Sequence, residues 1–127
     1  MAVRRTTLTA TGATGGAGTA TATATTQIPI DGEILAVHLA YLDAPPAATC
    51  DVTLVEGGVT PSQTILSIAN AATDGWFYPM AQAKNTAGTD LTGMGRELYV
   101  GGNLTLTIAQ ANDADGVTAT ILWDDGS

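Results

Sequence analysis

Residues 103–110 read Asn-Leu-Thr-Leu-Thr-Ile-Ala-Gln, and this stretch decides the fold class. Leu104, Leu106 and Ile108 alternate with polar or small residues, which is the period of two expected of a half-buried β-strand. Threonine is β-branched and itself favours strands, so local preference and hydrophobic pattern agree. We therefore predict a strand here, with one face in a core and the other in solvent.

The same pattern recurs on both sides of this strand. After the turn-forming stretch 112–116, residues 117–123 again place apolar side chains between threonines. Upstream, residues 50–56 and 63–69 are each of strand length and are separated by Gly and Pro. Strands this short, spaced by about 8 to 12 residues, predict an all-β fold: an antiparallel β-sandwich or jelly-roll-like barrel of about seven to eight strands with an extended N-terminal arm.

Three further segments complete the predicted body. Residues 33–43 carry apolar side chains on both alternating faces, which is typical of a central strand covered on both sides, although the length also permits a helix. Residues 76–79 read Trp-Phe-Tyr-Pro, and the proline favours an edge or a strand end. Residues 81–95 contain three glycines and few large apolar side chains, so we expect a loop there.

The N-terminal segment has a different composition. Between residues 6 and 26 the only large side chain is Leu8, and residues 19–25 alternate Thr with Ala. This alternation predicts a strand with a Thr face and an Ala face, provided that a neighbouring strand is available. We divide the chain into an extended Thr/Ala/Gly-rich arm, 1–26, and a β-sandwich body, 27–127. The arm is either a flexible leader or a segment that lies along another subunit.

Composition argues against catalysis. The chain has 127 residues, enough for one domain, with 22 Thr, 22 Ala and 15 Gly but only one Cys, one His and one Lys. No nucleophile or acid–base group has a supporting neighbour in sequence, so we expect no enzymatic activity and no cofactor. No apolar run approaches the ~20 residues of a membrane-spanning helix, so we expect no membrane partner.

Charge is unevenly distributed along the chain. Arg4 and Arg5 precede every acidic residue, whereas residues 31–127 carry two cations and all twelve acids, a net charge of −10. An acidic body repels phosphate, and two arginines are far fewer than a nucleic-acid-binding patch requires. We therefore expect no direct contact with nucleic acid.

A few residues are candidates for individual roles. His38 lies within an apolar run with no adjacent carboxylate, so we predict a packed or hydrogen-bonded structural histidine. Cys50 is predicted to be a small buried hydrophobic residue at a strand start. Residues 112–116 are predicted to form an Asx-rich hairpin turn, and we expect no metal site. Asp113 and Asp115 are the calcium candidate kept beside this prediction, because oxygen ligands at alternating positions before Gly116 resemble the opening of a calcium loop, although the loop's final Glu is missing and both flanks are strands.

Trp76, Phe77 and Tyr78 hold half of the six aromatic residues of the chain. Aromatic side chains dominate interface hot spots, so this cluster is either an anchor at a protein interface or a plug of the core, with a sugar-stacking platform as a third interpretation.

The segments in their order resemble small virion proteins of tailed bacteriophages that decorate, or cement, the head. The likeness covers most of the chain. It comprises the Thr/Ala arm, Gly32-Glu-Ile-Leu-Ala-Val-His-Leu-Ala-Tyr, Cys50-Asp-Val-Thr-Leu, residues 65–79 ending in Thr-Asp-Gly-Trp-Phe-Tyr-Pro, residues 104–110 and the final strand from Val117. The resemblance implies a β-sandwich or jelly-roll body that forms a homotrimer on the outer surface of the capsid. It also implies binding where major capsid protein subunits meet, with the arm reaching a neighbour.

We therefore expect a virion structural protein that stabilises a bacteriophage head by binding the shell of major capsid protein. The residues expected to contact the capsid or another subunit are Val3, Arg4, Arg5, Thr6, Leu8, Trp76, Phe77 and Tyr78. The alternative is a β-sandwich recognition module, carbohydrate-binding or adhesin-like, of a phage fibre or surface protein, in which Trp76 and Tyr78 stack on a sugar.

Overall fold

The predicted strand at residues 103–110 is confirmed, and it lies inside one of two facing sheets. The computed structural model describes residues 2–42 and 46–127. Strand β10 (Asn103–Ala111) pairs with β2 (Ala20–Thr25) on one side and with β4 (Asp51–Gly57) on the other, and β5 (Thr64–Ile68) follows β4. Leu104, Leu106 and Ile108 are fully buried because this face meets the second sheet.

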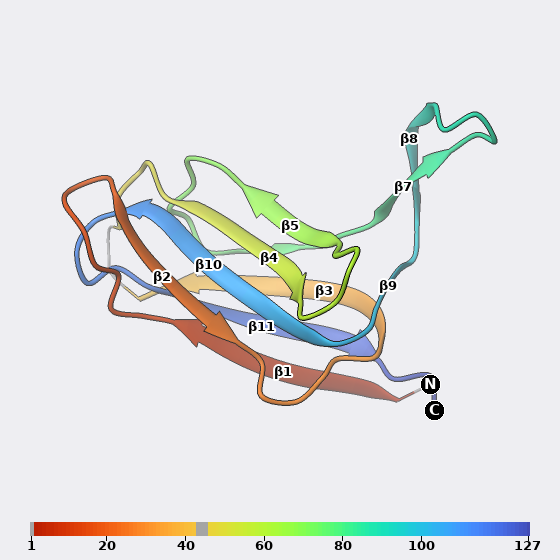
Figure 1. The fold of residues 1–127 in the computed structure, drawn as a ribbon, viewed down its shortest axis with the longest axis horizontal. Helices are drawn as coiled ribbons and strands as arrows, with labels where there is room; N and C mark the ends of the chain where they lie inside the picture. The colour runs from red at the N-terminus through yellow and green to blue at the C-terminus, as the bar shows by residue number, and fades with distance from the viewer. Residues whose placement is uncertain (1, 43–45) are drawn as a thin grey trace.

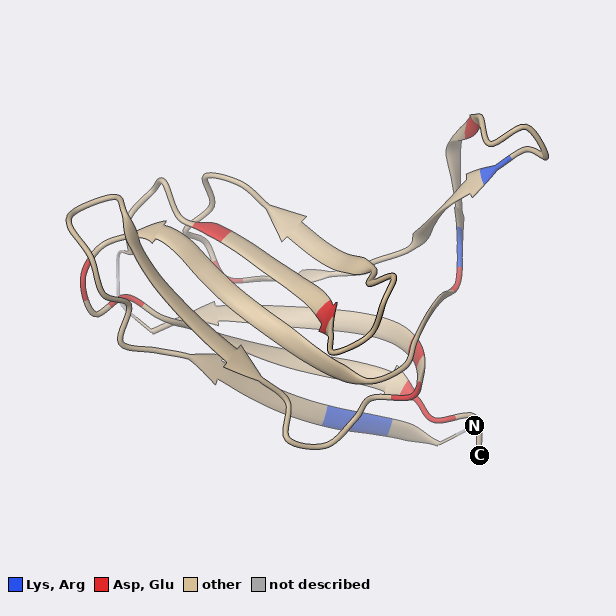
Figure 2. Cartoon of the chain, in the orientation of Figure 1, with Lys and Arg blue, Asp and Glu red and all other residues tan. Residues whose placement is uncertain are grey.

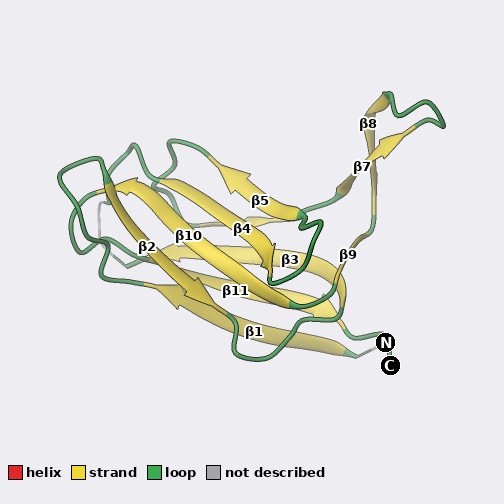
Figure 3. Ribbon diagram, viewed as in Figure 1, coloured by secondary structure: helices red, strands yellow, loops and turns green. Residues whose placement is uncertain are grey.

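The second sheet contains five strands. Its order is β1 (Val3–Ala10), β11 (Val117–Asp124), β3 (Gly32–Tyr41) and β6 (Gly75–Phe77), and β9 (Leu98–Val100) also pairs with β3. All pairings are antiparallel, and the two sheets lie face to face in a curled half-barrel (Figure 1). The all-β sandwich is therefore confirmed, with eleven strands rather than seven or eight and no helix among the described residues (Figure 3). No described segment forms a helix long and apolar enough to cross a membrane.

The core consists of aliphatic side chains from both sheets. The largest fully buried ones are Ile30, Leu39, Leu54, Leu104, Leu106, Ile108 and Ile121. Burying each such side chain contributes about 1.5–3 kcal/mol relative to leaving it exposed.

The segment expected to be a separate arm instead supplies one edge strand to each sheet. β1 pairs with β11 over its whole length, and β2 pairs with β10. Ala20 and Ala22 are buried while Thr21 and Thr23 are exposed, as the alternation predicts. The neighbouring strand, β10, belongs to the same chain. The small alanine side chains let β2 approach the core closely.

The prediction of a loop at residues 81–95 is wrong. β7 (Ala81–Lys84) and β8 (Asp90–Arg96) form a two-stranded sheet of their own, which projects from the sandwich (Figure 1). The Asn85 side chain accepts hydrogen bonds from the N–H groups of Ala87 and Thr89, which closes the turn. Polar side-chain bonds rather than an apolar pattern thus specify this hairpin.

Candidate interaction surface

The projecting hairpin is an insertion into one edge strand. β6 pairs with residues 37–39 of β3, and β9 pairs with residues 32–34. Both strands pair antiparallel with the edge of β3 that β11 does not occupy. On β3, only Leu35 and Ala36 separate the residues that pair with β6 from those that pair with β9. The chain therefore leaves this edge after β6, forms residues 78–97, and rejoins the same edge at β9. We call residues 78–97 the inserted hairpin.

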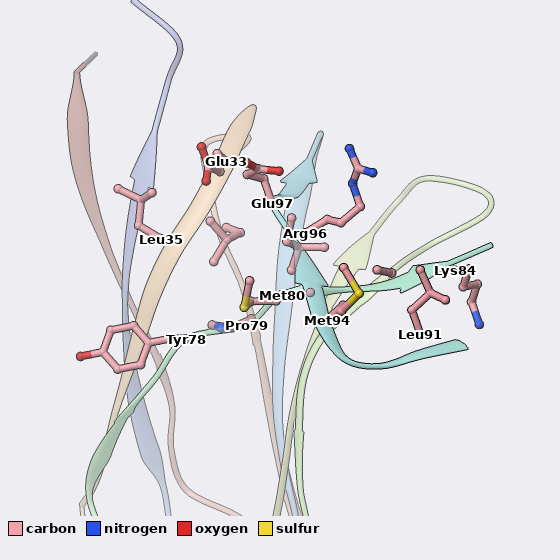
Figure 4. Close-up of a pocket in the computed structure, with 14 residues that line it drawn as sticks. Glu33, Leu35, Tyr78, Pro79, Met80, Lys84, Leu91, Met94, Arg96 and Glu97 are labelled. Carbon is pink, nitrogen blue, oxygen red and sulfur yellow. The ribbon is translucent and has the colours of Figure 1, made fainter. Parts of the chain in front are cut away.

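The inserted hairpin exposes large apolar side chains. Tyr78 is 68% exposed, Met80 is 62% exposed and Met94 is 58% exposed. Together with Leu91 they border a cavity of about 560 Å³ that lies between the hairpin and the Leu35 region of β3 (Figure 4). Contiguous exposed apolar side chains are characteristic of an interaction surface.

Charge distinguishes the inserted hairpin from the rest of the molecule. It carries two cations, Lys84 and Arg96, and two acids, Asp90 and Glu97, and is neutral on a chain whose net charge is −8. Lys84 forms a salt bridge with Asp90 across the two strands. In Figure 2 the cations lie on the hairpin and on β1, whereas the acids are spread over the whole molecule. A partner approaching the hairpin thus meets apolar surface with little net repulsion.

The aromatic cluster divides between core and surface. Phe77 packs against the core, whereas Trp76 is 46% exposed on the outer side of the sheet. The ring of His38 lies 4.9 Å from that of Trp76 at 59°, so His38 is packed, as predicted. Of the three aromatic residues, Trp76 and Tyr78 are exposed, and Tyr78 is the first residue of the inserted hairpin.

The N-terminal candidates lie at the opposite edge of the same sheet, and three of them have intrachain roles. Leu8 is buried in the core, and the Thr6 hydroxyl accepts a hydrogen bond from the Trp123 indole N–H at 3.0 Å. Arg4 donates through Nε to the Asp125 carboxylate. The remaining two, Val3 and Arg5, lie exposed on β1.

Hydrogen bonds at the C-terminus lower the pKa of the Asp125 carboxyl group. The side chain and backbone N–H of Ser127, followed by Arg4, lower the pKa of Asp125 to about 2 because they favour its ionised form. Asp125 is therefore a permanent anion at neutral pH.

The two calcium candidates point in different directions. Asp115 is fully buried and accepts hydrogen bonds from the N–H groups of Ala47 and Asn112, whereas Asp113 is exposed. Among the described residues no group of three or more His, Cys, Asp or Glu side chains is arranged to hold a metal ion. The calcium candidate is therefore not supported, and the segment is the turn that was predicted, held by an inward carboxylate.

Cys50 occupies the position predicted for it. It is fully buried one residue before β4. Burial, followed by the nearby Asp115, raises the pKa of its thiol, because both disfavour a thiolate. Cys50 is thus an unreactive core residue.

Sequence reasoning missed the apolar part of the interaction surface. Leu91 and Met94 stand among small and polar residues, and Met80 follows the aromatic cluster and Pro79 outside any alternating run, so no periodic pattern marks them. The only available signal is the presence of two methionines in a stretch otherwise poor in large side chains.

Comparisons of the chain with protein-family models, with curated proteins and with solved structures found no match.

Proposed function

We propose that this protein is a virion structural protein that decorates and stabilises a tailed-bacteriophage head by binding the outer surface of its major capsid protein shell. The observation that carries the proposal is the inserted hairpin, which the sandwich does not need for its sheets and which exposes Tyr78, Met80 and Met94. The resemblance of most of the chain to head decoration proteins supplies the biological setting.

The physical demands of decoration suit this surface. A shell offers many copies of one site, so a moderate contact per copy, summed over a homotrimer, gives stable attachment. Methionine side chains are flexible and polarisable, and adapt to a partner surface. An isolated two-stranded hairpin is marginally stable in water, and contact with a partner adds the packing that it lacks.

The test removes the inserted hairpin and keeps the sandwich. Because only Leu35 and Ala36 separate the pairing positions of β6 and β9, two glycines can join Phe77 to Leu98. This variant should melt cooperatively and yet fail to co-sediment with purified heads that retain the full-length protein at fixed stoichiometry.

A milder variant tests whether the exposed apolar side chains, rather than the hairpin backbone, contribute to binding. Met80→Ser with Met94→Ser should reduce head occupancy, whereas Val59→Ser, which changes an exposed apolar residue outside the hairpin, should not. Full occupancy by the variant without residues 78–97 would show that the hairpin is not the contact.

One observation favours a second candidate function. Trp76 on β6 and Tyr78 just after it are both exposed and are separated by one residue. A carbohydrate-recognition module uses such a pair to stack on a sugar. A melting temperature that rises with a panel of oligosaccharides, and does not rise in Trp76→Ala, would support this candidate over decoration.

A further inference from the structure

A second groove lies on the open side of the half-barrel, between edge strands β1 and β2. β1 pairs only with β11, and β2 pairs only with β10 apart from one bridge between Thr14 and Thr21. Most of the outer edge of each strand therefore has no strand partner among the described residues. The groove has a volume of about 880 Å³ and is lined by residues 3–9, residues 24–29 and Trp123.

Small side chains on β2 create the space. Ala24 lines the groove together with Leu8 and Trp123, and a larger residue at this position would fill part of it. The rims are apolar: Val3 on β1 is 53% exposed, and Ile28 after β2 is 76% exposed. The groove thus combines a partly apolar lining with unpaired strand edges, which is how proteins bind an extended peptide by strand addition.

The charge of the groove identifies the kind of segment that fits. Its lining includes Arg4 and Arg5 and no acidic residue, although the chain contains twelve acids. Arg4 uses its Nε for Asp125, and its two Nη groups make no hydrogen bond to the described residues. Arg5 forms no salt bridge with any described residue. Arg4 is thus already ion-paired, whereas the Arg5 guanidinium is available to a carboxylate of a partner.

We propose that the groove binds one extended, acidic segment of a partner polypeptide, which adds a strand to the free edge of β1 or β2. Its apolar side chains lie against Leu8, Trp123 and Ile28. Its carboxylates alternate with them and therefore lie on the opposite face of the added strand, on the side of Arg5, because neighbouring residues of β1 face opposite sides of the sheet. About six residues, roughly 20 Å of strand, match a typical strand pairing. This inference deepens the proposed function and rests on it only for the source of the segment, which is the capsid shell.

The test uses the full chain and a synthetic peptide, so it needs no phage heads. The protein has two tryptophans, and in a Trp76→Phe background only Trp123 reports, from the floor of the groove. The probe is an acetylated peptide of about eight residues that alternates valine with glutamate. Titration should shift the Trp123 emission and saturate. A lysine-for-glutamate peptide and a peptide with a central proline should bind at least about tenfold more weakly, because one loses the charge pairing and the other the strand pairing.

Protein variants locate the site. Arg5→Gln, which leaves the Arg4–Asp125 ion pair in place, should weaken binding of the glutamate peptide about threefold and reduce its salt dependence. Ile28→Ser should also weaken it, whereas Val59→Ser, an exposed apolar residue outside the groove, should not. Thermal melts confirm that each variant is folded.

Three results would overturn the inference. They are no emission change up to about 1 mM peptide, equal binding of the lysine peptide, or a concentration-dependent dimer that Ile28→Ser abolishes, which would make the occupant a second copy. The proposed function fails separately, because it is judged by whether removal of residues 78–97 releases the protein from heads.

Discussion

Asp115 ties three parts of the chain together from inside the protein. Its carboxylate accepts hydrogen bonds from the N–H groups of Ala47 and Asn112, and its backbone carbonyl accepts one from the Ala13 N–H. The Cys50 sulfur lies 4.0 Å from the same carboxylate. A single side chain thus fixes the β10–β11 turn against the segment before β4.

Asp115→Ala should lower the free energy of unfolding by about 1–3 kcal/mol. The change leaves the Ala47 and Asn112 N–H groups without their acceptor, a cost that removal of the unpaired Oδ1 atom only partly offsets. Asp115→Asn keeps one acceptor and should cost less. Urea unfolding measures both, and the control is Asp113→Ala, an exposed aspartate of the same turn. If Asp113→Ala were equally destabilising, the role assigned to Asp115 would be incorrect.

Tyr41 should make the free energy of unfolding depend on pH in the alkaline range. Burial, followed by the nearby Cys50 and Asp74, raises the pKa of Tyr41 to about 12, so the folded state holds the phenol proton more tightly than the unfolded chain, whose pKa is about 10. This contribution is fully present below about pH 10 and declines as pH rises toward 12. Unfolding measured from pH 9 to 12 should therefore show a steeper loss in wild type than in Tyr41→Phe; parallel curves would contradict the assignment.

The strands differ in how far their own sequence pattern predicts them. β10 and β11 were predictable because each carries its own period of two. β1 was not, because its residues pair with β11 more than a hundred positions away and carry little apolar pattern of their own. Along β3 strict alternation groups Leu35 with Val37 and Leu39, but a register shift in the β3–β11 pairing places Ile34 in the core instead. Bulges of this kind leave no mark on the alternation.

The inserted hairpin was missed because side-chain hydrogen bonds specify it. The Gln82 amide donates to the carbonyls of Leu91 at 2.9 Å and Met94 at 3.3 Å, and so bridges the strand pair. Those bonds follow from geometry that only the folded hairpin has, so the sequence contained no signal for them.

Gln82→Ala should loosen the inserted hairpin without weakening the sandwich. Amide hydrogen exchange should speed up in residues 81–96 and stay unchanged in β10, because local opening of the hairpin does not require unfolding of the core. The melting temperature should remain that of wild type. A matched change, Gln63→Ala, removes a side-chain bond to the Tyr99 carbonyl outside the hairpin. Faster exchange in the hairpin of that variant would indicate that the effect is not specific to Gln82.

At the scale of the whole molecule, two segments of similar length contribute very differently to stability. Residues 1–26 contain one edge strand of each sheet, and Leu8, Ala10, Ala20 and Ala22 are buried in the core. Residues 78–97 contribute one buried alanine, Ala83. Position in the chain therefore does not indicate which part is the appendage.

Deleting residues 1–26 should abolish cooperative unfolding, whereas deleting residues 78–97 should preserve it. The first deletion exposes the core face along both sheet edges, and the second leaves every strand pairing of the two main sheets in place. Calorimetry of the two variants distinguishes them. A cooperative transition in the protein lacking residues 1–26 would mean that β1 and β2 are not integral to the sandwich.

The two ends of the chain lie side by side, since the Asp125 N–H donates to the Ala2 carbonyl at 3.1 Å (Figure 1). A short linker between them can therefore close the chain into a ring, and new ends can be opened at the tip of the inserted hairpin. Such a circular permutant would carry any fused protein at the tip of the hairpin instead of beside the ends of β1 and β11. Because β6 and β9 each pair with β3, the hairpin between them can change length or sequence during evolution while the strands that carry it stay the same.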